Sequence, residues 1–339
     1  MLRIGFIGTG GMGQHHIENI MSTIPGATVV AVNDANEQVA QQVAANCGAR
    51  YIADPYALIR AEDVDAVMIA SWDPTHEGFS IAAIEAGKYV FCEKPLSDTP
   101  EGCQRIMEAE MKAGKRLLQV GFMRRYDKDY RELREVIASG TIGIPLVIHA
   151  THRNLAPAGG AEITNDMAAT NSLVHEFDVT RFLIGGNDTY VSAQLVTPRP
   201  SRFCGEGLLD PQLVYLETSS GIRIDLEMYW YCRYGYDIQC EVVGDLGTAS
   251  LPAPSHTVVR CDGKNAFKVV PTWQERFHEA YVTELREWIA SVQAGKIVGP
   301  SAWDGYVASS VAAACRQSRL TGKIVPIEQV QCPEFYQSI

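Results

Sequence analysis

The stretch that decides the fold is Ile4-Gly5-Phe6-Ile7-Gly8-Thr9-Gly10-Gly11-Met12-Gly13. An apolar run typical of a buried strand enters a Gly-x-Gly-x-x-Gly turn, and a helical pattern follows. In such a turn Gly8 permits the tight bend, Gly10 lets the backbone approach a pyrophosphate, and Gly13 allows close helix–strand packing. The helix that follows would offer free N–H groups to phosphates. We therefore predict a dinucleotide-binding unit whose cofactor contacts run from Gly8 to Gly13.

A carboxylate follows the second predicted strand, residues 27–32, at the spacing that a dinucleotide site requires. Asn33 and Asp34 come directly after that strand, and Asp34 lies about 20 residues beyond the glycine turn. A carboxylate there accepts hydrogen bonds from the ribose hydroxyls of the adenosine half and repels a 2′-phosphate. We expect NAD rather than NADP; an ordinary βαβ unit without a ligand is the alternative.

Length and charge narrow the class of protein. The chain has 339 residues, 46% hydrophobic and 20% charged, so it can bury a large core and is expected to form two domains. Its net charge of −11 argues against nucleic acid or an anionic membrane surface as the main partner. No apolar run approaches ~20 residues, so no transmembrane helix is expected.

The nine cysteines are expected to be reduced and mostly buried. They are scattered from Cys47 to Cys332 without a Cys-x-x-Cys pair, so we predict no metal site. Because the first predicted strand starts at Leu2, we expect no signal peptide and a cytoplasmic protein.

The first 122 residues alternate between strand and helix patterns. After the opening unit, strands are predicted near Tyr51 and at 64–70, 89–92 and 117–122. Helices are predicted at 36–46, from Pro55, at 75–86, and after Thr99, with Thr99 as cap and Pro100 at the first position. This alternation predicts an α/β Rossmann fold, a doubly wound parallel sheet that binds ligands at the carboxyl ends of its strands. We assign residues 1–122 to an NAD-binding domain.

Residues 123–339 are expected to form a substrate-binding and oligomerisation domain of the α+β class. Strands are predicted at 145–150, 190–197, 212–218, 222–230 and 238–243, and helices at 129–138, 172–183, 275–294 and 302–319. Alternation such as Ile222, Ile224, Leu226 and Met228 indicates a large, mainly antiparallel sheet with one buried face. Because the helices are too few to cover both faces, we expect another subunit on one of them.

The strand at 89–92 ends in Glu93-Lys94-Pro95, at the sheet edge where the nicotinamide is expected. A lysine there can donate a hydrogen bond to a substrate hydroxyl, or accept its proton if burial lowers the pKa of the ammonium group. A cis bond before Pro95 would aim Lys94 inward. An ordinary surface lysine at a strand end is the competing interpretation.

A second polar constellation is Asn171-Ser172-Leu173-Val174-His175-Glu176-Phe177-Asp178. On a regular helix Asn171 and His175, four residues apart, project from one face, and Asp178 follows His175 at the third position. A histidine in this place can take a hydroxyl proton while hydride leaves the same carbon. The competing interpretation is a core histidine satisfied by its neighbours.

These motifs resemble the glucose–fructose oxidoreductase/inositol dehydrogenase family. The resemblance rests on the glycine turn, Glu93-Lys94-Pro95 and the segment 175–178. Further segments are similar to its bacterial inositol dehydrogenase branch: Gln119-Val120-Gly121-Phe122-Met123-Arg124-Arg125-Tyr126-Asp127, His152-Arg153-Asn154, Tyr234-Gly235-Tyr236-Asp237-Ile238-Gln239-Cys240 and Trp303-Asp304-Gly305-Tyr306. It runs from the first strand to Glu334-Phe335-Tyr336, and so covers nearly the whole chain.

The resemblance implies NAD⁺-dependent oxidation of one ring hydroxyl of myo-inositol to a ketone, in a homotetramer. By matched position it makes Lys94 the catalytic lysine, His175 the proton acceptor and Asn171 a further catalytic position. It places Lys94, Met123, Arg124, His152, Asn154, Asn171, His175, Tyr236 and, more weakly, Tyr281 at the substrate. Topology and resemblance together place Ser71, Trp72, Pro74, His76, Glu93 and Lys94 near the cofactor, with His76 as a mere helix-start residue the alternative.

Asn171 is a departure from the family, which has an aspartate four residues before the histidine. An amide can donate or accept a hydrogen bond, but it cannot stabilise an imidazolium as a carboxylate does. Either Lys94 carries more of the proton transfer, or the pocket suits another substrate, such as scyllo-inositol or a pyranose sugar.

Three rival functions follow from the same residues. A scyllo-inositol or aldose dehydrogenase would share the fold, cofactor and catalytic residues. An enzyme that cleaves a glycosidic bond through transient oxidation would form product without net NADH. A non-catalytic NAD-binding regulator would have no use for both Lys94 and His175.

Overall fold

The computed structural model describes residues 1–155, 163–185, 188–252 and 258–337. The chain divides into two compact units, each built from separate stretches of sequence. The first unit comprises Met1–Met123, Tyr281–Ser309 and Gln331–Ile339, and the second comprises Arg124–Ala280 and Ser310–Val330. Within the described residues, no helix is both long and apolar enough to cross a membrane.

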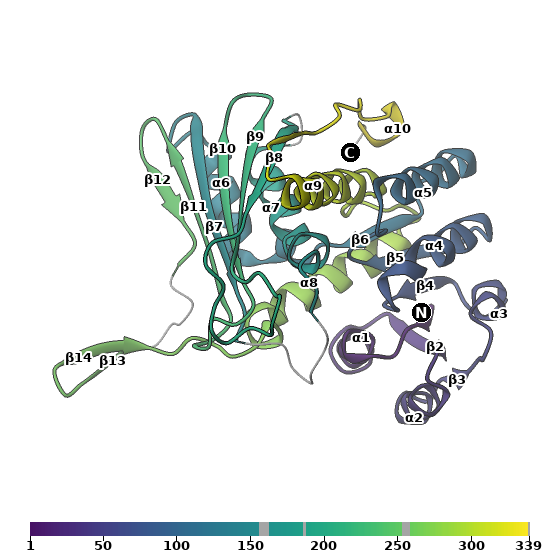
Figure 1. The fold of residues 1–339 in the computed structure, drawn as a ribbon. Coiled ribbons are helices and arrows are strands. Elements are labelled where there is room, and N and C mark those ends of the chain that lie inside the picture. Colours follow the sequence, from purple (N-terminus) through teal and green to yellow (C-terminus); the bar gives the residue numbers. More distant parts are fainter. Residues whose placement is uncertain (156–162, 186–187, 253–257, 338–339) are drawn as a thin grey trace. The chain divides into compact units, whose positions relative to one another are not determined.

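The first unit is built on a six-stranded parallel sheet in the order β3-β2-β1-β4-β5-β6 (Figure 1). The strands are β1 (Leu2–Ile7), β2 (Ala27–Asn33), β3 (Arg50–Tyr51), β4 (Ala66–Ile69), β5 (Tyr89–Glu93) and β6 (Leu118–Gly121). Strand order reverses between β1 and β4, which confirms the predicted doubly wound sheet. This switch point at the carboxyl ends of the strands is where such sheets bind their ligands.

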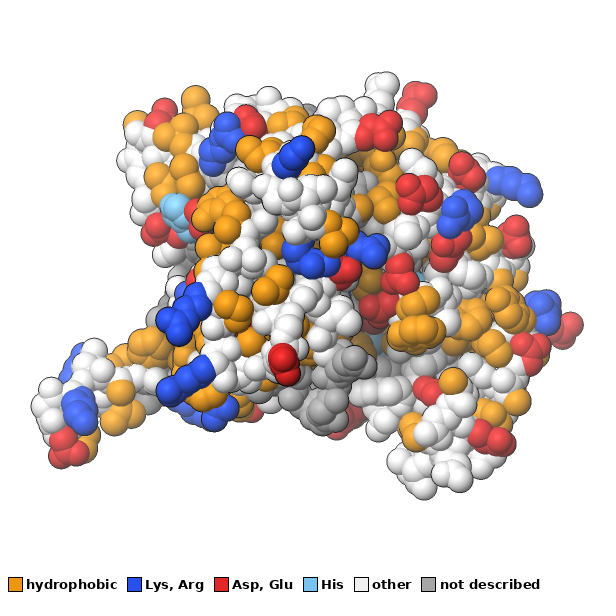
Figure 2. Space-filling model, in the orientation of Figure 1, with side chains coloured by type: hydrophobic (Ala, Val, Ile, Leu, Met, Phe, Trp, Pro, Cys, Tyr) orange, Lys and Arg blue, Asp and Glu red, His pale blue; other side chains and the backbone are white. Residues whose placement is uncertain are grey.

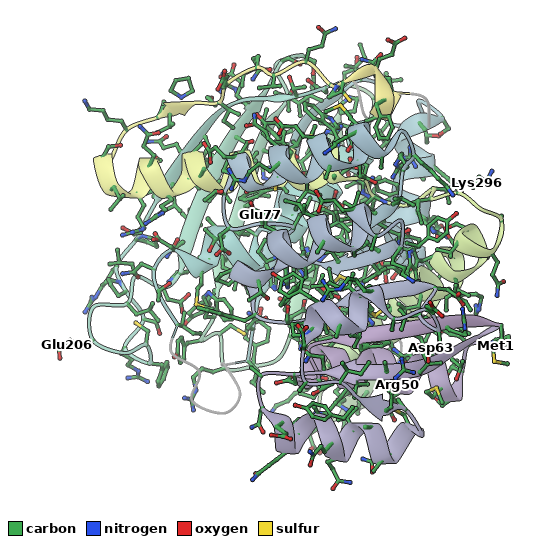
Figure 3. All side chains as sticks on the ribbon, turned by 90° about the vertical axis from the view of Figure 1, so that its right-hand side faces the viewer. Met1, Arg50, Asp63, Glu77, Glu206 and Lys296 are labelled. Atoms are coloured by element: carbon green, nitrogen blue, oxygen red, sulfur yellow. The ribbon has the colours of Figure 1, made fainter. Side chains whose placement is uncertain are left out.

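Helices connect these strands, and their ends carry the capping residues that the sequence predicts. They are α1 (Gly11–Ser22), α2 (Glu37–Cys47), α3 (Pro55–Arg60), the short η1 (Asp73–Thr75), α4 (His76–Glu85) and α5 (Pro100–Ala113). The Thr99 side chain accepts a hydrogen bond from the Gly102 amide, with Pro100 in the first turn. At the sheet edge, Arg50 forms an ion pair with Asp63 (Figure 3).

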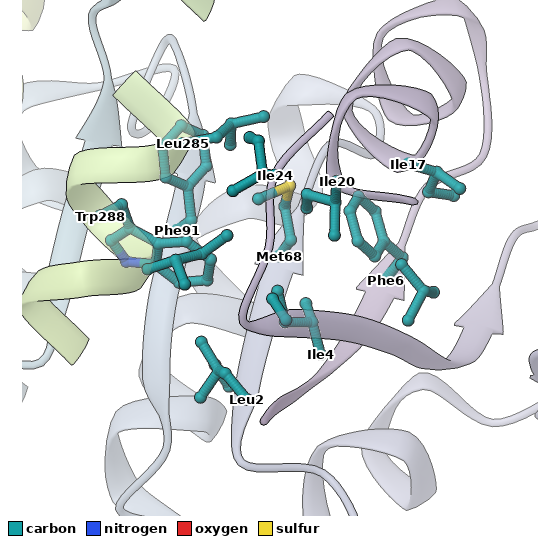
Figure 4. Packing of buried hydrophobic residues seen from close by; sticks show 14 of the residues in the cluster. Leu2, Ile4, Phe6, Ile17, Ile20, Ile24, Met68, Phe91, Leu285 and Trp288 are labelled. Carbon is teal, nitrogen blue, oxygen red and sulfur yellow. The ribbon is translucent and has the colours of Figure 1, made fainter. Parts of the chain in front are cut away.

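The core of the first unit lies between the sheet, α1 and the later half of α8 (Trp273–Gln293) (Figure 4). The fully buried Trp288 meets the ring of Phe91 edge-on, with 5.4 Å between centroids. Ile4 and Phe6 of β1 and Ile20 of α1 belong to the same cluster. This packing fixes β1 and β5, the strands that present the glycine turn and Lys94.

The second unit contains a seven-stranded sheet in the order β12-β11-β7-β10-β9-β8-β15. The strands are β7 (Pro145–Arg153), β8 (Tyr190–Val196), β9 (Gln212–Thr218), β10 (Arg223–Tyr229), β11 (Asp237–Gly244), β12 (Thr248–Ser250) and β15 (Val325–Pro326). Among the described strands of this sheet, β7 and β10 alone pair in parallel, so the sheet is mixed but mostly antiparallel, as predicted. Ile224, Leu226 and Met228 are buried on one face, which confirms the alternation seen in the sequence.

Helical elements of the second unit include η2 (Met123–Tyr126), α6 (Lys128–Ala138), η4 (Ala168–Ser172), α7 (Val174–Ile184) and α9 (Ala302–Thr321). Of these, η2 starts at the boundary between the units, and α9 has residues in both units. A separate hairpin, β13 (Val258–Cys261) with β14 (Lys264–Phe267), pairs only with itself among the described strands. The short helix α10 (Glu334–Gln337) falls in the first unit.

The helix predicted to start at Ser172 begins instead at Val174. The preceding residues form a π-helical turn, η4, closed by a hydrogen bond from the Leu173 amide to the Ala168 carbonyl (2.8 Å). This wider ring holds one residue more than an α-helical turn. The expectation that Asn171 shares a regular helix with His175 is therefore wrong, although the two lie on consecutive elements.

Candidate active site

Two glycines of the opening turn are required by the packing of the protein itself. Gly8 has φ +97°, and a Cβ there would lie 2.4 Å from the carbonyl group of Ala70. A Cβ on Gly13 would lie 2.1 Å from the Gly8 carbonyl oxygen. Both positions therefore exclude any larger residue, and they bring the start of α1 against the ends of β1 and β4.

Gly10 and Gly11 have no such internal explanation. Among the described residues, a Cβ at either position would meet no heavy atom within 4 Å apart from the adjoining backbone. Gly10 is also the N-cap of α1 and supplies no side chain that could accept a hydrogen bond from the first amides of the helix. A pyrophosphate group fits this cradle, because it would accept hydrogen bonds from those amides and occupy the space that side chains would fill.

Asp34 fastens the end of β2 to the glycine turn. One carboxylate oxygen accepts hydrogen bonds from the Thr9 amide (2.6 Å) and the Thr9 hydroxyl (3.1 Å). The other carboxylate oxygen accepts a hydrogen bond from the main-chain amide of Asn36 (2.8 Å). The half-buried carboxylate is thus held at the edge of the cradle, where a ribose diol would meet it and a further phosphate would be repelled.

Glu93, at the end of β5, is buried and pairs with His16 of α1. Its Oε1 lies 2.7 Å from His16 Nε2, and its Oε2 accepts a hydrogen bond from the Lys94 amide (3.1 Å). Burial opposes ionisation of Glu93, but His16 and Lys94 outweigh it and hold the pKa of this carboxyl below its ordinary value. The Lys94–Pro95 bond is cis, as the sequence suggested.

Of the residues predicted near the cofactor after β4, Trp72 is exposed and His76 is buried. Trp72 exposes 76% of its surface, and Pro74 lies in η1. Ser71 Oγ lies 2.6 Å from Thr75 Oγ1. His76 is buried, and its two ring nitrogens lie within hydrogen-bond distance of two main-chain carbonyl oxygens.

In the second unit, three predicted pocket residues gather around Glu176. The buried Arg124 guanidinium forms an ion pair with Glu176, and its Nη2 lies 3.2 Å from His152 Nδ1. The same His152 nitrogen lies 3.1 Å from Glu176 Oε2. Tyr236 meets the His152 ring edge-on, at 5.7 Å between centroids. Burial opposes the charge of Glu176, but Arg124 and His152 lower its pKa to about 2.

Asp178 forms a separate ion pair with Arg125. Arg125 Nε donates to both carboxylate oxygens of Asp178, at 2.8 and 3.1 Å. Adjacent arginines in the sequence thus pair with two acids of α7, Arg124 with Glu176 and Arg125 with Asp178. These pairs fasten the residues that follow β6 to the helix carrying His175.

The remaining predicted residues are placed as follows. His175 is buried in α7, and Asn171 is half-buried in η4; π-helical turns occur frequently at functional sites. Asn154 follows β7, and its amide donates to the Tyr229 carbonyl (2.8 Å). Met123 is buried at the start of η2. Tyr281 belongs to the first unit, where its ring packs edge-on against His15 and His16.

Two residues that organise these sites were not among the sequence-predicted site residues, namely His16 and Glu176. His16 lies three residues after Gly13, on the buried face of α1. Glu176 directly follows His175. In both cases the signal was a titratable residue on the same helix side as a buried apolar one, Ile20 for His16 and Leu173 for Glu176, which predicts burial and a charged partner. Among the described residues, no group of three or more His, Cys, Asp or Glu is arranged to hold a metal ion.

Comparison with known proteins identifies relatives over the full length of the chain. A model of an oxidoreductase family with an NAD-binding Rossmann fold matches residues 2–122. A model of the C-terminal alpha/beta domain of the oxidoreductase family matches residues 134–327.

Individual relatives agree with these matches. Inositol 2-dehydrogenase from Pseudomonas savastanoi pv. phaseolicola is 51% identical over 337 residues, 99% of each chain. Inositol 2-dehydrogenase from Serratia proteamaculans is 49% identical over the same length, also 99% of each chain. The structure of myo-inositol dehydrogenase from Lactobacillus casei, in complex with NAD(H) and myo-inositol, matches with a TM-score of 0.95 and 38% identity, covering 99% of this chain and 100% of the other.

Proposed function

Since this chain belongs to the oxidoreductase family with an NAD-binding Rossmann domain and a C-terminal alpha/beta domain, we propose that it acts as an inositol 2-dehydrogenase. It oxidises a ring hydroxyl of myo-inositol to the ketone and transfers the hydride to NAD⁺. The observation that carries this function is the near-complete match, at about half identity, to inositol 2-dehydrogenases over both whole chains. The Lactobacillus casei structure supports the same substrate and cofactor.

The first unit holds the cofactor. The cradle from Gly8 to Gly13 binds the pyrophosphate through the amides of α1, and Asp34 binds the adenosine ribose. The nicotinamide end lies beside the residues that end or follow β4 and β5, namely Ser71, Trp72, Pro74, His76, Glu93 and Lys94. When bound, the nicotinamide ring accepts the hydride.

Lys94 and His175 act on the substrate hydroxyl that loses its proton. His175 takes the proton from the alcohol as its carbon loses hydride, and Lys94 donates a hydrogen bond to the same oxygen. Asn171 contributes an amide where the family has a carboxylate, so it orients a substrate hydroxyl without adding negative charge.

The polyol is bound by polar side chains that the protein already holds in place. Arg124, His152 and Tyr236 are fixed by contacts around Glu176 in the second unit. With Met123, Asn154 and Tyr281 they complete the substrate-contacting set that the family resemblance assigns. Ordered donors and acceptors suit a cyclitol, because each hydroxyl must find a partner once water is excluded.

We further propose a cytoplasmic homotetramer that serves inositol catabolism. The outward face of the seven-stranded sheet carries side chains such as Arg223, Asp225 and Tyr215, and the hairpin β13–β14 exposes Val259 and Phe267. Figure 2 shows hydrophobic and basic side chains side by side on this hairpin. An isolated two-stranded hairpin is marginally stable in water, which favours its burial by another subunit.

The decisive assay follows the absorbance of reduced nicotinamide with myo-inositol, scyllo-inositol or D-glucose, each with NAD⁺ and with NADP⁺. We expect the highest kcat/KM with myo-inositol and NAD⁺. A preference for scyllo-inositol or D-glucose would instead support the neighbouring dehydrogenases. Binding of NAD⁺ without turnover of any polyol would refute the enzyme and favour a regulator.

A further inference from the structure

His76 occupies an unusual place at the end of the parallel sheet. It is the first residue of α4 and exposes only 1% of its surface. Its Nδ1 lies 2.7 Å from the Pro95 carbonyl oxygen, and its Nε2 lies 3.1 Å from the Ser71 carbonyl oxygen. Ser71 follows β4 and Pro95 follows β5, two strands that pair in parallel. One buried ring thus connects the loops that follow two neighbouring strands.

The chemistry of these partners decides the protonation of the ring. A carbonyl oxygen only accepts hydrogen bonds, and a neutral imidazole carries a single N–H. Each ring nitrogen of His76 faces one carbonyl oxygen. In the neutral ring, the nitrogen without a proton would point its lone pair at a carbonyl oxygen. The imidazolium instead donates a hydrogen bond to each of the two carbonyl oxygens. Two carbonyl acceptors, one at each ring nitrogen, therefore favour the doubly protonated form.

The surroundings of His76 contain features that oppose protonation of the ring and features that favour it. Burial and its position at the N-terminus of α4 disfavour a cation. Cys92 of β5, the Pro95 carbonyl and Asp73 of η1 favour the protonated ring. Asp98 faces the ring from the loop before α5. Glu77, the next residue in the chain, is paired with Arg105. Although burial alone would lower the pKa of His76, these neighbours raise it to about 10.

The position of this cation bears on the catalytic lysine. Lys94 lies between two residues that are each held by a buried histidine. Glu93, before it, pairs with His16, and the Pro95 carbonyl, after it, accepts from His76. The main chain on both sides of Lys94 is therefore fixed relative to β4 and α1.

We infer that His76 is an imidazolium at neutral pH that positions Lys94 and the Ser71 loop against the cofactor, and is not itself a ligand of the cofactor. This inference rests on the proposed dehydrogenase function. It makes His76 a positioning residue: removing the ring misplaces the lysine without removing any group that contacts the substrate.

The protonation state is measured directly on the NAD-bound wild-type enzyme. Nitrogen NMR of protein labelled at its 8 histidines is recorded at a pH between 6.5 and about 10. We expect one ring to stay doubly protonated where ordinary histidines are neutral, and its signals to vanish in His76→Gln. If no ring is doubly protonated in this range, the inference is overturned, whether or not any variant folds.

The positioning role is measured in His76→Ala. We expect kcat to fall about 10²-fold, as for a displaced catalytic group, while the dissociation constant of NAD⁺ changes by less than about tenfold. Added imidazole should enter the vacated space and raise kcat in a saturable manner. Pyrazole has a similar shape but is not protonated at neutral pH, so it should not restore activity.

Ile84→Ala is the matched control, because Ile84 is a buried residue of the same helix. It should lower thermal stability yet keep kcat and show no response to imidazole. Wild-type turnover in His76→Ala, or equal rescue by pyrazole, would overturn the inference. Failure of wild-type enzyme to oxidise inositol would instead refute the proposed function, and the NMR measurement would still decide the state of His76.

Discussion

At the scale of single residues, the second unit is organised by charges that are buried in pairs. Arg124 and Glu176 are each about 1% exposed, and each supplies the counter-charge that the other needs in the interior. Such a pair fixes both side chains and leaves neither free to move with the substrate. The pocket residues Arg124 and His152 are therefore pre-positioned, which reduces the entropy cost of binding a polyol.

Replacing Glu176 by Gln should destabilise the protein by about 3–5 kcal/mol, because the Arg124 guanidinium is left buried without its counter-charge. The pKa of Glu176 is lowered to about 2 from 4.5, so its contribution to stability is complete above pH 4.5 and is lost as the pH falls toward 2. Urea unfolding across this range measures both effects. A stability difference between wild type and variant that stays constant down to pH 2 would contradict the assignment.

Lys94→Ala should lower kcat by about 10²–10⁴-fold, the range of a lost proton-transfer partner, and leave NAD⁺ binding intact. NADH fluorescence titration and steady-state kinetics separate the two quantities. Lys115→Ala is the control, since Lys115 is an exposed lysine of the same unit that bonds only the Tyr89 hydroxyl among the hydrogen bonds described. Near wild-type turnover in the Lys94 variant would remove this residue from the mechanism.

Asn171→Asp should change the ranking of inositol isomers. An ionised carboxylate only accepts hydrogen bonds, whereas the amide also donates one. The measurement is kcat/KM for myo-inositol and scyllo-inositol in both proteins. Unchanged ratios between the isomers would show that Asn171 does not select among them.

At the scale of elements, regular patterns in the sequence predicted the regular parts of the fold. The structure confirms three local patterns of this kind. They are the glycine turn, the helix cap at Thr99 and the alternation of apolar residues from Ile222 to Met228. The π-helical turn before His175 was missed because α7 is buried on nearly all sides. One extra residue rotates the following side chains by about 100°, and without a single apolar face that rotation leaves no mark on the sequence pattern. Strands β12 and β15 contain two or three residues, too few for any period to appear.

The glycine turn itself offers a matched test of cofactor binding. Gly10→Ala adds a methyl group that meets no other described residue within 4 Å beyond the adjoining backbone, so the protein should fold normally while its affinity for NAD⁺ falls. Gly78→Ala in α4 adds a methyl group at ordinary contact distance and should leave NAD⁺ affinity unchanged. Isothermal titration with NAD⁺ gives both values, and equal affinities in the two variants would argue against a pyrophosphate at Gly10.

At the scale of the whole molecule, composition and motif order were sufficient to predict an NAD-binding parallel sheet followed by a mostly antiparallel one. Family membership confirms the resemblance seen in the motifs. Sequence could not predict that Tyr281–Ser309 and Gln331–Ile339 belong to the same unit as the N-terminal sheet, because helix periodicity gives a buried face but not its partner. The roles of the site residues stay predictions.

The proposed tetramer depends on surfaces that are exposed in the single chain. Phe267→Asp places a charge on the hairpin β13–β14, where the phenylalanine is 49% exposed, and should shift the mass in solution below that of a tetramer. Met21→Ser removes an exposed apolar side chain from α1 and should leave the mass unchanged. Analytical ultracentrifugation measures both variants. A tetramer that persists in the Phe267 variant would exclude this hairpin from the interface.

The most direct measurement is a crystal structure of the enzyme with NAD⁺ and myo-inositol bound. We predict that the Lys94 ammonium and the His175 imidazole both contact one ring hydroxyl, whose carbon lies about 3–3.5 Å from nicotinamide C4. A structure in which these two side chains contact different parts of the substrate, or do not contact it, would contradict the account.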